Sequence, residues 1–314
     1  MTVVGPGEPS GGGRRRRGMR RRVVGAVAAG LVLAGCGQPP PGAAPGTTDE
    51  APTRGPAPAG ALTTRSPATV LDAGDGAQVC LGGVMESMPP QCRGVPLAGW
   101  DWADHEGAYE EAGAVRWGDF TVTGTFDGTT LTVTDALPGA LGTGTGDVPR
   151  RDVGPPCPEP AGGWADDPLP LVAHEEVLAA ARARADYAGG WVTHRDPRPA
   201  EEIDQLVADD PGAGLVPPVV TIRVTGDPAA AEADLRPLWD GPLCVTTAER
   251  TEAELVEIQT EVNAVDGMLG SSQDTLTGTV DLQVVHDDGT LQAELDERYG
   301  AGVVRVESAL VPLS

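Results

Sequence analysis

Hydrophobic and polar positions alternate most regularly in the second quarter of the chain. Over residues 120–126, apolar or small side chains fall on one face of an extended backbone and threonines fall on the other. The alternation resumes at Leu131 and Val133, after an Asp127-Gly128 pair that is typical of a tight turn between strands. This pattern predicts a β-hairpin.

A further strand is predicted upstream, at residues 77–84. Short strands joined by Gly and Pro turns are typical of small all-β domains. We therefore expect a small all-β domain, barrel-like or a sandwich, over residues 69–155. Its strand spacing is analogous to that of oligonucleotide/oligosaccharide-binding barrels.

Residues 156–218 are predicted to be a joint, because proline and glycine interrupt both periodicities at its start. A helix is expected over residues 170–188, followed by a strand and a short helix. From residue 219 onwards, strands alternate with helices whose starts carry cap signals, Asp227-Pro228 and the capping box Thr251 to Glu254. The order β-α-β-α-β-α-β predicts a ferredoxin-like sandwich over residues 219–314, and the chain as a whole is expected to be α+β.

The N-terminal segment has a different pattern. Arginines at residues 14–22 precede an apolar run, Val23–Val32, that is too short for the roughly 30 Å core of a bilayer and fits the apolar region of an export signal. Leu33-Ala34-Gly35 then precedes Cys36. This arrangement resembles the lipobox of bacterial lipoproteins. The resemblance implies that residues 1–35 are removed and that the Cys36 thiol carries a diacylglyceryl group.

Residues 36–68 are rich in Pro, Ala and Gly and have few large apolar side chains, so they are expected to form an extended tether. The predicted location is the outer face of the cell membrane, with the lipid as the membrane attachment. An ordinary secreted protein with a chance cysteine is the alternative. Export through the twin-arginine route is conceivable from Arg21-Arg22, although the residues that follow match that signal poorly.

Charge narrows the range of partners. The 22 basic residues are all arginine, and the chain has 46 acidic residues. Seven of the arginines and one of the acidic residues precede residue 36, so the remainder holds 15 arginines against 45 acidic residues. Such a chain is repelled by nucleic acids and by anionic membrane surfaces, which excludes nucleic-acid binding as its expected function.

Once Cys36 is assigned to lipid, four cysteines remain, and an even number in an exported protein indicates disulfides. Three pairings are possible. We favour Cys80 with Cys92, because Pro89-Pro90 can turn the intervening chain back, and Cys157 with Cys244. A zinc site is the alternative, but CxxC spacing is absent and the histidines are scattered.

The segment 100–105 contains the side chains best suited to bind a ligand. Trp100 and Trp102 would share a face of a strand and could stack on a sugar ring beside Asp101, or they could fill a core together with Trp117. We favour the core. An envelope hydrolase that uses Asp101, Asp104 and His105 is an alternative hypothesis.

Other candidate motifs indicate structure more than chemistry. Residues 142–148 are glycine-rich but have no following helix to receive a phosphate, which favours a linker. His286 to Gly289 reads as a turn and helix cap in preference to a cation site. Nucleophile elbows, a Walker loop, HExxH and the dinucleotide glycine pattern are absent from the sequence, so we expect no enzyme, cofactor or metal.

Short motifs at YAGGWVTH, VVTIRVTGD, TEAELVEIQ and LDERYGAGVVRVES carry a second resemblance, which spans residues 187–310. They resemble prodomain modules of secreted bacterial serine proteases of the α-lytic type and exported proteins of high-GC Gram-positive bacteria that share such modules. The resemblance implies a folding or inhibitory partner of a secreted protease. Because no protease domain follows in this sequence, the fold can be present without that role.

Together these features predict a binding or protein-interaction module at the cell envelope, with an envelope protein or glycan as its partner. The alternatives are the envelope hydrolase, the protease partner and a structural protein without a ligand.

Overall fold

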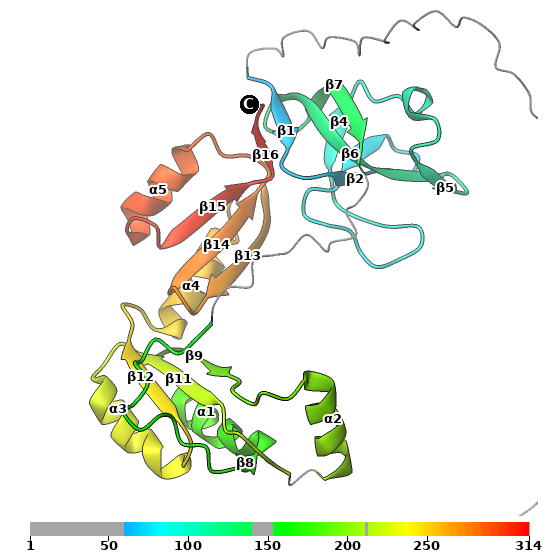
Figure 1. Cartoon of the computed structure of the whole chain (residues 1–314). Coiled ribbons are helices and arrows are strands. Elements are labelled where there is room, and N and C mark those ends of the chain that lie inside the picture. The colour runs from blue at the N-terminus through cyan, green and yellow to red at the C-terminus, as the bar shows by residue number, and fades with distance from the viewer. Residues whose placement is uncertain (1–59, 140–152, 211–212, 314) are drawn as a thin grey trace, which may run out of the picture. The chain divides into compact units, whose positions relative to one another are not determined.

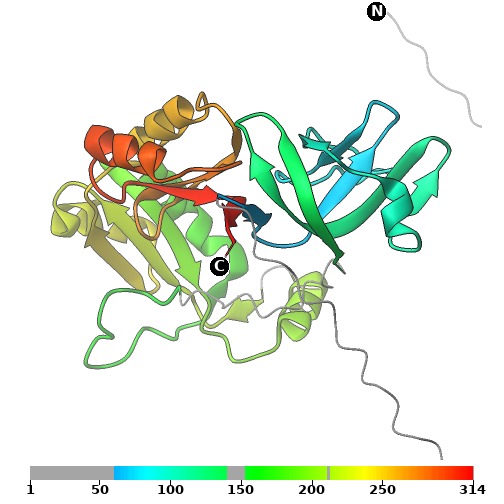
Figure 2. The ribbon, with the colours of Figure 1, turned by 90° about the horizontal axis from the view of Figure 1, so that it is seen from above.

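The computed structural model of this chain describes residues 60–139, 153–210 and 213–313 (Figure 1 and Figure 2). Four predicted features lie outside the described residues: the signal peptide, the lipidation site Cys36, the tether up to residue 59 and the glycine-rich linker 142–148. The described chain is α+β, as expected, with helices and strands distributed over several sheets.

Eight strands form the first sheet, in the order β16-β1-β6-β2-β3-β4-β7, with β5 paired to β6. The strands are β1 (Leu62–Thr64), β2 (Ala68–Asp72), β3 (Ala77–Val79), β4 (Val95–Ala98), β5 (Glu110–Ala112), β6 (Val115–Phe126), β7 (Leu131–Pro138) and β16 (Leu310–Pro312). The predicted hairpin is confirmed, since β6 and β7 pair antiparallel. The Asp127 carboxylate holds its turn by accepting hydrogen bonds from the backbone N–H groups of Thr129 and Thr130.

This sheet is not a closed barrel. β7 pairs with both β4 and β6, so this part of the sheet curves around a core that contains Phe120, Val122 and Leu131. β16 lies outside the curved part, at one end of the strand order. β16 pairs antiparallel with β1, which places Leu62 opposite Pro312. β1 lies within the predicted tether, so the folded chain begins before residue 68, and the reason is that the Leu62 side chain packs into the core.

The remaining elements form two units of the same topology. Each runs helix, strand, strand, helix, strand, and in each three-stranded sheet the central strand is antiparallel to the first and parallel to the last. The first repeat, residues 175–247, consists of α1 (Glu175–Arg182), β9 (Tyr187–Thr193), β11 (Val219–Val224), α3 (Pro228–Leu235) and β12 (Leu243–Thr247). The second repeat, residues 252–308, consists of α4 (Glu252–Val262), β13 (Met268–Asp274), β14 (Thr279–Val284), α5 (Thr290–Tyr299) and β15 (Val304–Ser308).

The two repeats match residue by residue in their cores. Buried positions a constant sixty residues apart occupy the central strand and the second helix of each repeat: Val220 and Val280, Ile222 and Leu282, Val224 and Val284, Leu235 and Leu295. In each repeat these side chains pack with residues of the first helix into one core on one face of the sheet. The architecture is therefore a tandem repeat.

The repeats differ in the connection between their first two strands. In the second repeat, β13 and β14 are joined by a tight turn in which the Gly278 N–H donates to the Asp274 carbonyl. In the first repeat, the described residues 194–210 and 213–218 form an insertion with α2 (Ala200–Asp209) and β10 (Gly214–Leu215). β10 pairs with β8 (Leu169–Pro170), outside the repeat's own sheet.

The ferredoxin-like prediction is not confirmed. Its strands were expected to share one sheet, but β11 and β12 belong to the sheet of the first repeat and β14 and β15 to that of the second. The predicted helix 170–188 is also too long, because Tyr187 leaves the helix and pairs with Val224 as the start of β9. The predicted caps are confirmed: Asp227 accepts from the Ala229 N–H, and Thr251 and Glu254 form the capping box of α4.

Both favoured disulfides are present. Cys80 is bonded to Cys92 across the loop between β3 and β4, and Cys157 is bonded to Cys244 of β12. The second bond fixes the chain that follows the first sheet onto the sheet of the first repeat.

Candidate functional site

The predicted aromatic pair lies in the core of the first sheet. Trp102 begins a 3-10 helix (Trp102–His105) rather than a strand, and its side chain is buried, with its indole N–H donating to Asp72. The Trp100 and Trp102 rings meet edge to face at 5.2 Å, and Trp100 also meets Phe120 at 4.9 Å. Trp102 is buried and Trp100 is partly buried, with His105, Trp102 and Phe120 packed around its ring. These contacts favour the core interpretation, because neighbouring side chains already pack against the rings on which a sugar would stack. Trp117 is not part of this cluster and lines a separate groove.

The residues of the hydrolase hypothesis lie around the same 3-10 helix. Asp101 and Asp104 are exposed, and the Asp101 carboxylate caps the helix by accepting from the Ala103 N–H. The His105 ring stacks on Trp100 at 4.4 Å. None of the cavities described below is lined by these three side chains. Their geometry therefore gives no support to a shared acid–base centre.

The motif at residues 286–289 acts as a helix cap, as favoured from the sequence. The Asp287 carboxylate accepts from the N–H groups of Leu291 and Gln292, and Asp288 accepts from that of Thr290. His286 Nδ1 lies 2.9 Å from the Leu310 carbonyl oxygen and so joins the end of β14 to β16. Within residues 60–139, 153–210 and 213–313, no group of three His, Cys, Asp or Glu side chains could hold a metal ion.

A candidate site does appear on the second repeat, on the face of its sheet opposite the helices. The strand register aligns two rows of side chains across this face. One row is Ser272, Asp281 and Arg305, and the other is Gly270, Gln283 and Glu307. These six residues, here called the open face, line a hollow of about 480 Å³ together with Ser271.

Arg305 makes the open face rigid. Its Nε lies 2.9 Å from Asp281 Oδ1, and its Nη2 donates to Asp274 at 3.1 Å and to Thr279 at 2.6 Å. Asp274 is buried, so this ion pair is screened by water less than an exposed pair would be. Arg305 is thereby held in place, while Ser272, Gln283 and Glu307 are exposed to solvent.

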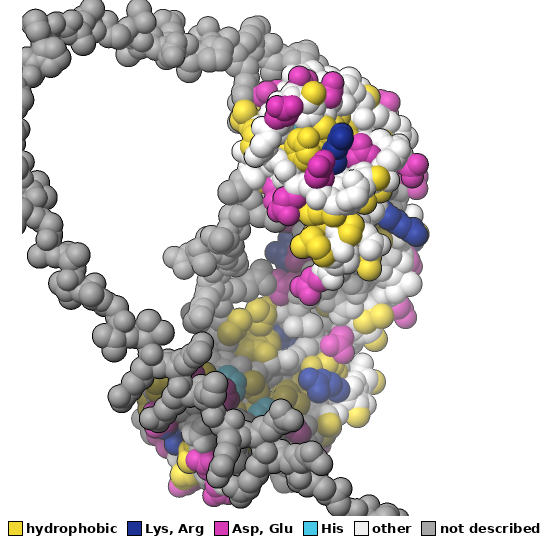
Figure 3. Space-filling model, turned by 90° about the vertical axis from the view of Figure 1, so that its right-hand side faces the viewer, with side chains coloured by type: hydrophobic (Ala, Val, Ile, Leu, Met, Phe, Trp, Pro, Cys, Tyr) yellow, Lys and Arg dark blue, Asp and Glu magenta, His cyan; other side chains and the backbone are white. Residues whose placement is uncertain are grey.

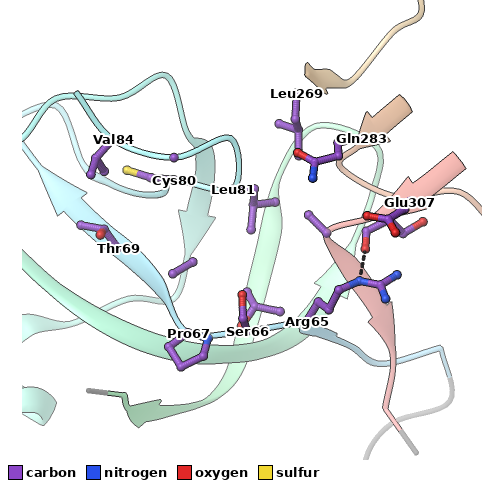
Figure 4. A pocket seen from close by; sticks show the side chains of 15 residues that line it. Arg65, Ser66, Pro67, Thr69, Cys80, Leu81, Val84, Leu269, Gln283 and Glu307 are labelled. Carbon is purple, nitrogen blue, oxygen red and sulfur yellow. Dashed lines mark hydrogen bonds between the residues drawn. The ribbon is translucent and has the colours of Figure 1, made fainter. Parts of the chain in front are cut away.

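A second cavity, of about 310 Å³, continues from the open face towards the first sheet and shares Gln283 and Glu307 with it (Figure 4). One end is polar, with Arg65 beside Glu307. The middle and the other end are more apolar, with Leu81, Leu269 and Val84. The cavity is at the small end of the range for ligand pockets. A ligand that carries both an apolar group and hydrogen-bonding groups would match this lining.

Backbone pairing builds this cavity. Arg65 follows β1, and its backbone N–H donates to the Ala309 carbonyl while its Nε donates to the Ser308 carbonyl at 2.9 Å. On the opposite wall, Cys80 donates its N–H to the Thr69 carbonyl and is fixed by its disulfide. Segments far apart in the sequence therefore hold the cavity walls at defined positions.

The corresponding face of the first repeat is covered. Its row is Trp191, Thr221 and Cys244, which occupies the same register as Ser272, Asp281 and Arg305. Thr221 and Cys244 are buried. The covering segment, residues 153–166, is held by the Cys157–Cys244 disulfide and by the Val153 carbonyl, which accepts from the Trp191 indole and the Thr193 hydroxyl. Arg195 adds hydrogen bonds to Ala165 and Asp166.

Part of this site could be predicted from the sequence. The alternation of Val280, Leu282 and Val284 predicts a strand, and its polar partners Asp281 and Gln283 therefore share the opposite face. The contribution of Arg65 was not accessible, since it lies in a stretch whose composition indicates a tether.

None of the described helices is long and apolar enough to cross a membrane. The chain matches no known protein-family model and no curated protein.

Proposed function

We propose that this chain is a lipid-anchored binding protein on the outer face of the cell membrane, and that its ligand contacts the open face and the adjoining cavity. The observation that carries the proposal is the contrast between two sheet faces of equal topology, one covered by its own chain and the other left as a rigid polar surface beside an amphipathic cavity. A folded chain that covers one such face and leaves the other accessible has a surface suited to a partner.

The two disulfides support the proposed location, because disulfides persist in oxidising compartments outside the cytosol. The lipobox-like segment before Cys36 supports the anchor. Mass spectrometry of the mature protein tests this part. We expect a diacylglyceryl-modified Cys36 as the first residue, and an intact leader or a free thiol at this position would refute it.

The chemistry of the cavity favours a protein segment over a glycan as ligand. Leu81, Val84 and Leu269 suit an apolar side chain, while Arg65, Gln283 and Glu307 suit backbone or polar groups. A glycan would be expected to require an exposed aromatic ring, and the cavity lining contains none. A secreted protease, as the resemblance to prodomain modules implies, would be one such protein.

The experiment compares two charge reversals in the soluble chain, residues 37–314, which contains every described element. Glu307→Arg alters the open face, and Glu257→Arg alters an exposed position on α4 with the same change of charge. We expect immobilised wild-type and Glu257→Arg proteins to retain the same partner from envelope fractions, and Glu307→Arg to lose it. Equal retention by all three proteins, or no reproducible partner for the wild type, would refute the proposal.

A further inference from the structure

The loop between β3 and β4 exposes large apolar side chains to water. Met88 is 80% exposed, Met85 is 65% exposed and Val84 is 42% exposed. Exposed methionines are common on surfaces that adapt to a partner, because the side chain is flexible and polarisable. This concentration stands out in a chain with only five methionines and two phenylalanines.

The exposed side chains border a groove of about 540 Å³, here called the methionine groove. Met85 and Met88 lie along it, and Tyr109, Trp117 and Pro138 also line it. Trp117 is only partly buried, unlike Trp102 in the neighbouring core. The groove is thus an open surface with apolar and aromatic side chains next to polar ones such as Ser87 and Glu110. Protein interfaces concentrate their binding energy at such clusters of apolar and aromatic side chains.

The loop is held in one shape before any partner arrives. The Cys80–Cys92 disulfide closes it, the Met85 N–H donates to the Gln91 carbonyl at 2.9 Å, and the Ser87 hydroxyl donates to the Pro89 carbonyl at 2.9 Å. A preorganised loop loses little conformational entropy on binding, which increases the affinity available from a small apolar surface.

Charge around the groove selects the partner. Glu110 and Asp119 line the groove, and none of the described basic residues does. The segment 80–119, which provides much of the lining, contains seven acidic residues and two arginines. One of the two, Arg116, lies 3.7 Å from Glu111 and 6.0 Å from the centre of the Tyr109 ring. Figure 3 views the side of the molecule on which β5 lies and shows hydrophobic side chains gathered there among acidic ones.

We propose that the methionine groove docks a segment of an exported protein that carries apolar side chains flanked by Lys or Arg. The acidic surroundings attract such a segment and repel both an anionic bilayer and a second copy of this lysine-free, acidic chain. The groove shares Thr69 and Val84 with the cavity beside the open face, so the two ligands would be neighbours, but Met85, Met88 and Trp117 line the groove and not that cavity. The proposal does not rest on the proposed function.

The mature chain offers a direct probe. After residue 36 it contains three methionines, Met85, Met88 and Met268, so a sample labelled with ¹³C at the methionine methyl groups reports on the groove with two signals and on β13 with one. The soluble chain, residues 37–314, is titrated with a Leu/Lys peptide, a Leu/Glu peptide and a Ser/Lys peptide of equal length. Phosphatidylcholine vesicles with and without phosphatidylglycerol are tested in parallel.

We expect the Leu/Lys peptide to shift the Met85 and Met88 signals, leave that of Met268 unchanged and bind at least about tenfold more tightly than the other two peptides, a margin of the size that apolar burial and charge complementarity give. Met85→Gln with Met88→Gln should weaken this binding by about tenfold. The control Val256→Gln, an exposed apolar position on α4, should not weaken it.

Four outcomes would overturn the proposal. Binding to vesicles in place of peptides would make the loop a membrane contact. Methyl shifts that depend on protein concentration alone would make it a self-association surface. Equal binding of all three peptides, or unchanged binding in the double variant, would show that the groove does not recognise this class of partner. Because neither variant touches Gln283 or Glu307, these results are independent of the Glu307→Arg experiment.

Discussion

The two repeats have the same topology and matching but separate cores, and they differ in what lies on the outer face of each sheet. In the first repeat the row Trp191, Thr221 and Cys244 is neutral and largely covered, and in the second repeat the row Ser272, Asp281 and Arg305 is charged and open. The backbone permits either state. A neutral row therefore accompanies a covered face and a charged row an exposed one, on the same arrangement of strands.

The largest expected loss of stability comes from releasing the segment that covers the sheet of the first repeat. Replacing Cys157 and Cys244 by alanine releases residues 153–166 from the sheet and removes a constraint over 87 residues, which should lower the free energy of unfolding by about 4 kcal/mol. Hydrogen exchange should accelerate more in β9 and β12 than in β13–β15. If exchange increased equally in both repeats, the covering segment would not be specific to the first repeat.

The next test exchanges the residue types at one matched position of the two rows, Thr221 and Asp281. Thr221→Asp places a carboxylate on the covered face at a site with 0% exposure, and we expect a loss of about 3 kcal/mol at neutral pH, because a buried charge lacks solvation. The reciprocal Asp281→Thr removes only a partly exposed contact to Arg305 and should cost less than about 1 kcal/mol.

Burial raises the pKa of the introduced carboxyl, so the destabilisation in Thr221→Asp should shrink as pH falls below the carboxyl's folded-state pKa. Chemical denaturation of both variants between acidic and neutral pH measures this. Equal and small losses in the two variants would show that the face of the first repeat is open to water.

A smaller effect on stability is expected at the first helices of the two repeats, because only one of them has a side-chain N-cap. α4 begins with the capping box of Thr251 and Glu254, whereas the N-cap residue of α1, His174, makes no side-chain capping bond. Thr251→Ala should lower the free energy of unfolding by about 1 kcal/mol, and His174→Ala should lack this capping loss. Thermal denaturation of each variant, with Thr260→Ala as an exposed control on α4, gives the comparison.

The smallest effect on stability is expected in the insertion between β9 and β11, which only the first repeat contains. Hydrogen bonds from Arg198 hold the pKa of Asp196 well below its ordinary value, and the Val216 N–H donates to the same carboxylate. A depressed folded-state pKa stabilises the insertion above the ordinary Asp pKa of about 4, and this contribution is lost as the pH falls further. The free energy of local opening of the insertion, obtained from exchange rates relative to the intrinsic rates at each pH, should fall below about pH 4 in the wild type. Asp196→Asn should remove most of that pH dependence. A wild-type opening free energy that does not change with pH would contradict this prediction.

Local signals in the sequence predicted much of the secondary structure and both disulfides. The β6–β7 hairpin follows from alternation and an Asp-Gly turn, and the caps at Asp227 and Thr251 follow from residue type and spacing. The sequence also contains the matched apolar pairs sixty residues apart, such as Ile222 and Leu282. The alternation of strands and helices does not distinguish two three-stranded sheets from one larger sheet.

The cavity could not be predicted because it depends on pairing across the chain. Arg65 reaches Ser308 only because β1 pairs with β16, and no local pattern relates residues so distant. The methionine groove had a stronger local signal, since Met85 and Met88 lie in a short stretch between two cysteines, but its aromatic wall at Trp117 comes from another strand.

The pairing of β1 with β16 has a consequence for the order in which the molecule is completed. Synthesis from the N-terminus produces Leu62 long before Pro312, yet these residues face each other in the same sheet. The first sheet is thus begun early and completed late, and the edge of β1 that pairs with β16 stays unpaired until residues 310–312 have been made.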